Sequence, residues 1–249
     1  MNAPPRFYVA NSLRGRFNAR GLRRLGAWLD ADVVQKRPLP PDRTGLVFSK
    51  DEVRLHTPGQ KAQLWHPGMV HRRRRLVRDP LAEAIGLRPG ETVLDGTLGM
   101  GHDALMLAVS GAEVHALECI AALLFFTLDG IRRHAPHVAG RIHARRADHR
   151  EWLAAAAPGS VDHVYLDPMF PPAVGGESTT WVTLRGFTLG AGETTDQRPT
   201  ADTLRAAWRA ARRTVALKLA PFEPPPQVPD LPPARLEGSR RVHFAVWRR

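Results

Sequence analysis

The chain of 249 residues has one cysteine, few lysines and no long apolar run. The single Cys119 excludes an internal disulfide and any metal site that needs two thiolates from one chain. No stretch approaches the roughly eighteen apolar residues of a membrane span, and no apolar segment follows the first charges as in a secretion signal. We therefore expect a cytoplasmic protein without a membrane or metal partner, in which Cys119 is a small buried residue rather than a nucleophile.

Positive charge is concentrated in the first third of the chain. Only four of the 36 basic residues are lysines, which a genome that favours arginine would explain, and the net charge is +12. Residues 1–75 hold sixteen Lys and Arg against five Asp and Glu, whereas residues 76–249 hold twenty against nineteen. Codon bias does not produce this asymmetry. We therefore predict two domains, a basic module over residues 1–75 that contacts a nucleic acid and a larger domain over residues 76–249.

The first 75 residues predict a small α+β module. Strand-like runs lie at residues 7–10 and 45–48, and the second continues through a turn into residues 53–55 as a hairpin. Residues 19–29 between the runs have the apolar spacing of a short helix with arginines on its solvated side.

A run of basic residues, His71 to Arg75, follows this module. Asp79 can cap a helix that starts at Pro80 and is closed by Gly86. The basic run is either a solvated linker or a phosphate contact, and in the second case its binding residues are Arg72, Arg73 and Arg74.

From Thr92 onward, predicted strands and helices alternate. The strands lie at residues 92–97, 112–118, 141–144, 161–167 and 214–219, and the helices at residues 101–110, 120–133, 149–157 and 201–213. This order predicts an α/β fold, a mostly parallel Rossmann-like sheet with helices on both faces. Residues 234–236 and 242–246 predict an antiparallel hairpin that brings the sheet to seven strands. The Gly- and Thr-rich residues 173–200 predict a functional loop or lid, or a disordered segment.

A glycine-spaced turn follows the first of these strands. The hydrophobic strand ends in Asp95 and is followed by Thr97, Gly99 and Gly101 before the next helix. Glycines at such a turn let the backbone approach a ligand closely. The spacing is not that of a dinucleotide fingerprint but resembles the first motif of class I methyltransferases, which bind S-adenosylmethionine. These four residues are therefore candidates for cofactor binding.

Two further acidic residues follow strands. Glu118 ends the second strand, where an acidic side chain hydrogen-bonds ribose hydroxyls in nucleotide-binding Rossmann-like folds. Asp148 follows the third strand and either meets the adenine edge or caps the helix after it.

The segment from Asp167 to Pro172 carries the sharpest chemical signal. It lies at the carboxyl end of the fourth strand, where open α/β sheets bind ligands. The exocyclic amine of a base is a weak nucleophile, and a carboxylate from Asp167 and a carbonyl held by Pro168 can accept its two protons in hydrogen bonds. Phe170 can stack on the base. The pattern is similar to the Asp-Pro-Pro-Tyr/Phe motif of amino methyltransferases.

The sequence Val-Tyr-Leu-Asp-Pro-Met-Phe-Pro, residues 164–171, resembles the RsmJ family of bacterial small-subunit ribosomal RNA guanine-N2 methyltransferases. The resemblance spans roughly residues 65 to 249 and, more faintly, the N-terminal module. Supporting matches are His71 to Arg73, the turn from Thr97 to Asp103, Ser110-Gly111 and Arg213 to Lys218.

By this resemblance, a larger set of residues borders the cofactor, with Asp167 also nearest the methyl transfer. The set comprises His102, Asp103, Glu118, Cys119, Asp148, His149 and Asp167. The family's Arg-Asn-Pro after the acid of the second strand is replaced by Cys119-Ile120-Ala121, and a lysine-rich helix is replaced by residues 173–197. The RNA site is therefore where this chain departs from the family.

The sequence thus predicts methyl transfer from S-adenosylmethionine to a base amine, guanine N2 in small-subunit ribosomal RNA. Lys218 either steadies a phosphate or substrate group or extends into solvent. The alternatives are a DNA amino methyltransferase, a small-molecule methyltransferase, or an RNA-binding assembly factor that kept the fold without activity. The oligomeric state stays open.

Overall fold

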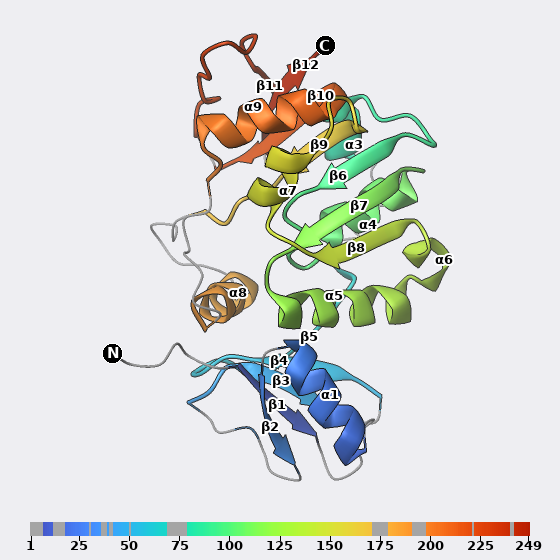
Figure 1. Ribbon diagram of the computed structural model, residues 1–249, viewed down its shortest axis with the longest axis vertical. Helices are drawn as coiled ribbons and strands as arrows, with labels where there is room; N and C mark the ends of the chain where they lie inside the picture. Colours follow the sequence, from blue (N-terminus) through green and yellow to red (C-terminus); the bar gives the residue numbers. More distant parts are fainter. Residues whose placement is uncertain are drawn as a thin grey trace. The chain divides into compact units, whose positions relative to one another are not determined.

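The computed structural model describes residues 7–11, 18–29, 31–35, 39, 42–49, 51–68, 79–170, 179–190, 198–220, 222–239 and 242–249. The chain forms two compact units. The smaller unit comprises residues 1–66, 120–130 and 169–196, and the larger unit comprises residues 67–119, 131–168 and 197–249. Each contains its own β-sheet (Figure 1). Among the described residues, no helix has the length and apolar character needed to cross a membrane.

The smaller unit contains a five-stranded sheet in the order β2-β1-β3-β4-β5. Its strands are β1 (Phe7–Asn11), β2 (Ala31–Gln35), β3 (Gly45–Phe48), β4 (Val53–His56) and β5 (Gln63–Leu64). Strand β1 runs parallel to both neighbours, and β3 and β4 form the antiparallel hairpin that the sequence predicted. Strand β2 was not predicted, because a short run of two valines acquires strand geometry only by pairing with β1.

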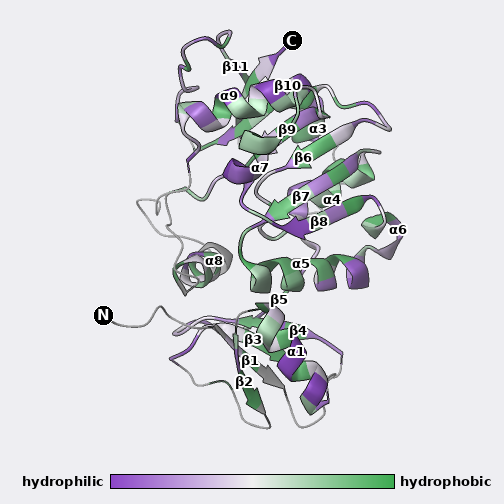
Figure 2. Ribbon diagram, in the orientation of Figure 1, coloured by the Kyte–Doolittle hydropathy of each residue, from purple (hydrophilic) through white to green (hydrophobic). Residues whose placement is uncertain are grey.

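Helix α1 (Ala19–Leu29) joins β1 to β2 and has two different faces. Leu22, Gly26 and Leu29 are buried, whereas polar residues interrupt the apolar ones along the helix (Figure 2). Residues 120–130, which include the first ten residues of helix α5 (Ala121–His134), complete this core. Phe125 of this segment packs edge-on against Phe48, with ring centroids 5.5 Å apart.

Helix α8 (Thr179–Gly190) lies inside the segment predicted to be irregular, so that prediction is wrong for these residues. Its sequence is rich in Thr and Gly, which favour helix weakly. Contacts within the smaller unit compensate. The Gln63 side chain donates to the Thr183 hydroxyl at 2.8 Å, the Thr57 hydroxyl donates to the Thr183 carbonyl at 3.3 Å, and Phe187 is fully buried.

The larger unit contains a seven-stranded sheet in the order β11-β12-β10-β9-β6-β7-β8. Its strands are β6 (Thr92–Asp95), β7 (Glu113–Glu118), β8 (Ile142–Arg146), β9 (Val161–Leu166), β10 (Ala211–Leu219), β11 (Arg235–Gly238) and β12 (His243–Arg248). The five strands from β10 to β8 are parallel, and β12 and β11 are antiparallel additions. This is the mostly parallel Rossmann-like sheet that the sequence predicted.

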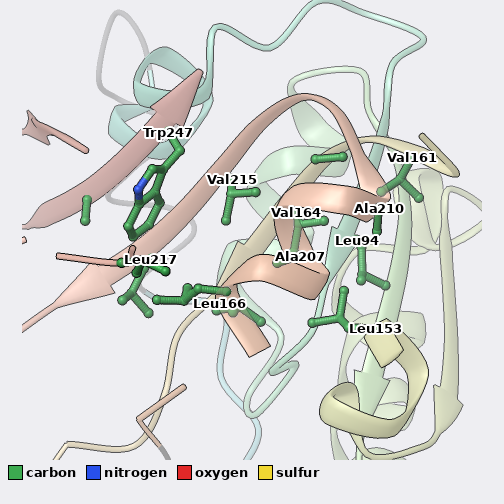
Figure 3. Close-up of a cluster of buried hydrophobic side chains, with 14 of the residues drawn as sticks. Leu94, Leu153, Val161, Val164, Leu166, Ala207, Ala210, Val215, Leu217 and Trp247 are labelled. Atoms are coloured by element: carbon green, nitrogen blue, oxygen red, sulfur yellow. The ribbon is translucent and has the colours of Figure 1, made fainter. Parts of the chain in front are cut away.

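Helices cover both faces of this sheet (Figure 1). Helices α3 (Pro80–Ile85) and α4 (His102–Val109) contact each other on one face, and α7 (His149–Ala155) and α9 (Ala201–Ala210) contact each other on the opposite face. A further short helix, α6 (Pro136–Ala139), precedes β8. In the core of the α7 and α9 face, side chains of the strands such as Val164 and Val215 pack against Ala207 and Leu153 (Figure 3). Burial of each larger side chain contributes about 1.5–3 kcal/mol.

The start of α3 is as predicted, and the end of α9 is not. The Asp79 carboxylate accepts hydrogen bonds from two backbone N–H groups of α3, and Gly86 closes that helix with φ of 66°. Helix α9 ends at Ala210 and β10 begins at Ala211, whereas the prediction continued the helix to Arg213. Arginine and alanine favour helix, but pairing of Ala211 with Val161 of β9 makes this stretch a strand.

Candidate active site

Polar side chains gather at the carboxyl edge of the seven-stranded sheet. Asp95 and Glu118 end β6 and β7, Asp167 directly follows β9, and Lys218 is the penultimate residue of β10. Because parallel strands end at the same edge, residues distant in the sequence meet there. Asp103 joins them from the first turn of α4.

The glycine turn after β6 is tightly fitted between its neighbours. A Cβ on Gly96 would lie 2.6 Å from the Cδ2 atom of Leu166 and 3.2 Å from the Cβ atom of His149, so a larger residue there would displace its neighbours. Gly99 and Gly101 have φ of 50° and 69°, which other residues rarely adopt. The Gly99 N–H donates to the Glu118 carboxylate at 3.0 Å. The turn is thereby fixed to the end of β7 and leaves its backbone close to the edge of the sheet.

Asp167 is held from two sides. Its backbone N–H donates to the Thr97 hydroxyl at 2.6 Å, which ties the segment after β9 to the glycine turn. Its Oδ2 atom accepts from the Lys218 ammonium at 2.6 Å, and the same ammonium lies 3.3 Å from Oδ2 of Asp103. The hydroxyl of Tyr165 also donates to that Asp103 oxygen, at 2.8 Å. We call Asp103, Tyr165, Asp167 and Lys218 the carboxylate clamp.

Negative charge exceeds positive charge at this edge. Burial, together with the charges of Asp103, Asp167 and Glu118, raises the pKa of Asp95 to about 8. Burial alone would lower the pKa of Lys218, but the carboxylates of Asp103 and Asp167 outweigh it and raise that pKa. Lys218 is therefore a permanent cation shared between two carboxylates. The edge is electrostatically suited to a cationic ligand.

Asp148 caps α7, as one of its two predicted roles required. Its Oδ1 atom accepts from the Arg150 N–H at 2.8 Å, and the Arg150 guanidinium binds the same carboxylate. The hydrogen bond from Arg150 lowers the pKa of Asp148, and burial lowers the pKa of the neighbouring His149. Near neutral pH, Asp148 is therefore ionised and His149 is uncharged.

The other predicted cofactor residues are neighbours in the chain of residues already described at this edge. His102 begins α4 directly before Asp103. Cys119 is partly exposed rather than buried, and its thiol lies 3.6 Å from Oε1 of Glu118. Pro168 is buried directly after Asp167.

The predicted substrate residues fall into three groups. Phe170 belongs to the smaller unit, where its carbonyl accepts from Arg185 at 3.0 Å. Arg72, Arg73 and Arg74 lie outside the described residues. Lys218 is mostly buried between carboxylates, so the alternative that it extends into solvent is wrong.

Tyr165 was not among the predicted site residues. The signal was present, because Tyr165 and Asp167 are two residues apart along the same extended segment, and residues at this spacing point to the same side. The partnership of Lys218 with Asp103 had no comparable signal, since 115 residues separate them.

A parallel sheet with this glycine turn, an acid at the end of the next strand and an Asp-Pro segment beside it defines a class I methyltransferase. The family model described as "Putative SAM-dependent methyltransferase" matches residues 37–229. The chain therefore belongs to this family, the RsmJ-like methyltransferases, and its cofactor is S-adenosylmethionine.

Individual relatives agree with this assignment. A ribosomal RNA small subunit methyltransferase J of Halorhodospira halophila is 33% identical over 89% of this chain and 88% of its own. Its counterpart in Alkalilimnicola ehrlichii is 43% identical over 110 residues, 42% of either chain. A crystal structure of a SAM-dependent methyltransferase from Neisseria gonorrhoeae, 23% identical, superposes with a TM-score of 0.67 over 97% of this chain and 95% of that chain. This last likeness shows the fold.

Proposed function

We propose that this protein transfers a methyl group from S-adenosylmethionine to an exocyclic base amine, guanine N2, in small-subunit ribosomal RNA. The observation that carries the proposal is the position of Asp167, whose backbone and carboxylate are both held at the carboxyl edge of the sheet. Relatives that align over most of their length are named ribosomal RNA small subunit methyltransferase J, which supports the choice of RNA.

The residues at the edge fit the proposed cofactor. The glycines of the turn offer backbone without side chains, Glu118 would accept hydrogen bonds from the ribose hydroxyl groups, and the excess of carboxylates matches a sulfonium cation. When bound, S-adenosylmethionine supplies an electrophilic methyl group on that sulfonium. Asp95, Gly99, Gly101, Glu118 and Asp148 would hold it.

Asp167 would act on the nucleophile. The amine of guanine has its lone pair delocalised into the ring, and a carboxylate that accepts hydrogen bonds from the amine protons returns electron density to nitrogen. Asp167 or solvent would take the proton that the amine loses on methylation. Lys218 would keep Asp167 ionised and fixed, so catalysis is mainly positioning.

The proposed RNA contacts rest on charge. Helix α1 exposes Arg20, Arg23 and Arg24, and none of these is in an ion pair in the part of the chain that the structure describes. Exposed arginines on one short helix suit the phosphate backbone of RNA. Pro168 would help to present the base.

The test is transfer of radiolabelled methyl groups from S-adenosylmethionine to ribosomal RNA from a strain that lacks this protein. We expect label in small-subunit RNA that digests to N2-methylguanosine and that disappears with Asp167→Ala. Binding of cofactor without labelling of RNA would overturn the proposed substrate and direct the search to DNA and small molecules. If the protein did not bind the cofactor, the alternative of an RNA-binding assembly factor without activity would replace the proposed function.

A further inference from the structure

Phe222 is exposed to an extent unusual for an aromatic residue. Its relative exposure is 98%, higher than that of the other large hydrophobic residues in the described part of the chain. Phenylalanine normally buries most of its surface. Scattered apolar residues on a surface need no explanation, but Phe222 has a second peculiarity in its backbone.

The backbone of Phe222 is left-handed, with φ of 66°. A side chain with a Cβ adopts this conformation only at a cost in free energy, and asparagine or glycine would adopt it more readily. Two hydrogen bonds across the turn hold it. The Glu223 N–H donates to the Ala220 carbonyl at 3.1 Å, and the Ala220 N–H donates to the Glu223 carboxylate at 2.9 Å. The fold therefore maintains a strained turn whose effect is to display an aromatic ring.

The turn lies at the edge of the sheet that carries the proposed catalytic carboxylate. Phe222 follows β10 by three residues, and β10 runs parallel to β9. Phe222 is the fourth residue after Lys218, so their Cα atoms lie within roughly 14 Å of each other. The Lys218 ammonium in turn contacts Asp167. Strained backbone and an exposed aromatic residue beside a site are typical of a ligand contact.

We propose that Phe222 is a stacking platform for a nucleobase of the RNA substrate, either the target guanine or its neighbour in the strand. This inference rests on the proposed function, because its ligand is the RNA substrate of that function. A base has a flat apolar face that an exposed phenyl ring covers regardless of base identity. Because the backbone of the turn is already held before binding, it loses little conformational freedom when the base arrives. The base stack would orient the amine toward Asp167.

The test compares three substitutions at one position. Phe222→Asn and Phe222→Leu remove the ring, whereas Phe222→Tyr keeps it, and asparagine also suits the left-handed backbone. We expect the Kd and the KM for small-subunit RNA to rise roughly 5- to 140-fold with asparagine or leucine. Tyrosine should stay within about threefold of wild type. The matched control is Leu236→Ala, which removes an exposed apolar side chain from the edge strand β11.

Two further measurements separate stacking from a structural role. The Kd for S-adenosylmethionine should stay within about twofold of wild type in every variant. The Tm of Phe222→Asn should equal or exceed that of wild type, because asparagine relieves the backbone strain, whereas a packing role for the ring would lower it.

The outcomes distinguish this inference from the proposed function. If wild type methylates RNA and the asparagine and leucine variants do so with unchanged KM, the stacking inference is wrong and the proposed function stands. If RNA binding depends on Phe222 but no methyl group is transferred, the inference stands and the proposed function fails. A change in oligomeric state with unchanged RNA affinity would assign Phe222 to a contact between copies of the chain and overturn the inference.

Discussion

The two ends of the seven-stranded sheet both carry ionised side chains, but they balance them differently. At the amino end, Glu91 binds His163 at 2.9 Å and Arg213 at 3.1 Å. Asp162 there accepts from Arg212 at 2.8 Å and from the backbone and hydroxyl of Thr92. At the carboxyl end, the carboxylates of Asp103 and Asp167 share the Lys218 ammonium, and the charges of Asp103, Asp167 and Glu118 act on the buried Asp95.

The pKa directions follow this difference. Hydrogen bonds from Arg212 and Thr92 lower the pKa of Asp162, whereas burial among other carboxylates raises the pKa of Asp95 to about 8. The amino end thus pairs its carboxylates with basic side chains, which stabilises the sheet. The carboxyl end retains unbalanced negative charge at a cost in stability, which is typical of a ligand-binding site.

The largest expected effect is on Asp167. Asp167→Asn should lower kcat for methyl transfer about 10²- to 10⁴-fold, because an uncharged amide neither strengthens the nucleophile nor takes its proton. The Kd for S-adenosylmethionine should change only a few-fold, measured by isothermal titration calorimetry. The matched control at the other end of the sheet is Asp162→Asn, which should retain kcat. Equal losses of kcat in both variants would show that the two ends do not differ in function.

Lys218→Met tests whether the clamp keeps Asp167 ionised. Without the ammonium, Asp103 and Asp167 repel each other, so the pKa of one of them rises and the acidic limb of the kcat profile should move to higher pH. We also expect the free energy of unfolding to fall by about 2 kcal/mol, less than for a fully buried ion pair because Lys218 is partly exposed. Lys218→Arg should restore most of the profile. A uniform drop in kcat at all pH values would instead indicate a structural role.

Asp95→Asn should remove a pH dependence of stability. The folded pKa of about 8 lies above the ordinary value of 3.8, so the folded state holds a proton that the unfolded state releases. In the cofactor-free protein, the contribution of Asp95 to the free energy of unfolding should therefore be greatest below about pH 4. It should fall as the pH rises toward 8, by up to about 1.4 kcal/mol per pH unit. Urea unfolding between pH 5 and 8 should show a flatter dependence in the variant. An unchanged slope would exclude Asp95 as its origin.

The smallest expected effect is at the amino end. Asp162→Asn loses charged hydrogen bonds from Arg212 and should lower the free energy of unfolding by about 1–2 kcal/mol. Because the folded pKa of Asp162 is lowered, its stabilisation is present above pH 3.8 and is lost as the pH falls further. The difference from wild type in thermal unfolding should therefore shrink in strong acid. If the difference in thermal unfolding between the variant and wild type persists in strong acid, the loss of stability comes from packing and not from the charge of Asp162.

Much of the larger unit could be predicted from the sequence. The alternation of strands and helices, the cap at Asp79 and the order of the glycine turn, Glu118 and Asp167 all depend on residues within a few positions of each other. Errors arose where local preference and tertiary pairing disagree. Residues 211–213 have the composition of a helix but belong to strand β10, where Ala211 pairs with Val161, and α8 is stabilised by Gln63 and Thr57, more than 100 residues away.

The sequence by itself determined the parallel sheet, the methyltransferase class and the residues at the ends of its strands, because periodic burial, turn chemistry and motif order are local properties. Only the tertiary structure decided that Lys218 bridges Asp103 and Asp167, that Tyr165 supports Asp103, and that Phe222 is displayed rather than buried. These features depend on which distant segments share an edge of the sheet and which surfaces stay uncovered. Packing of the whole chain fixes both.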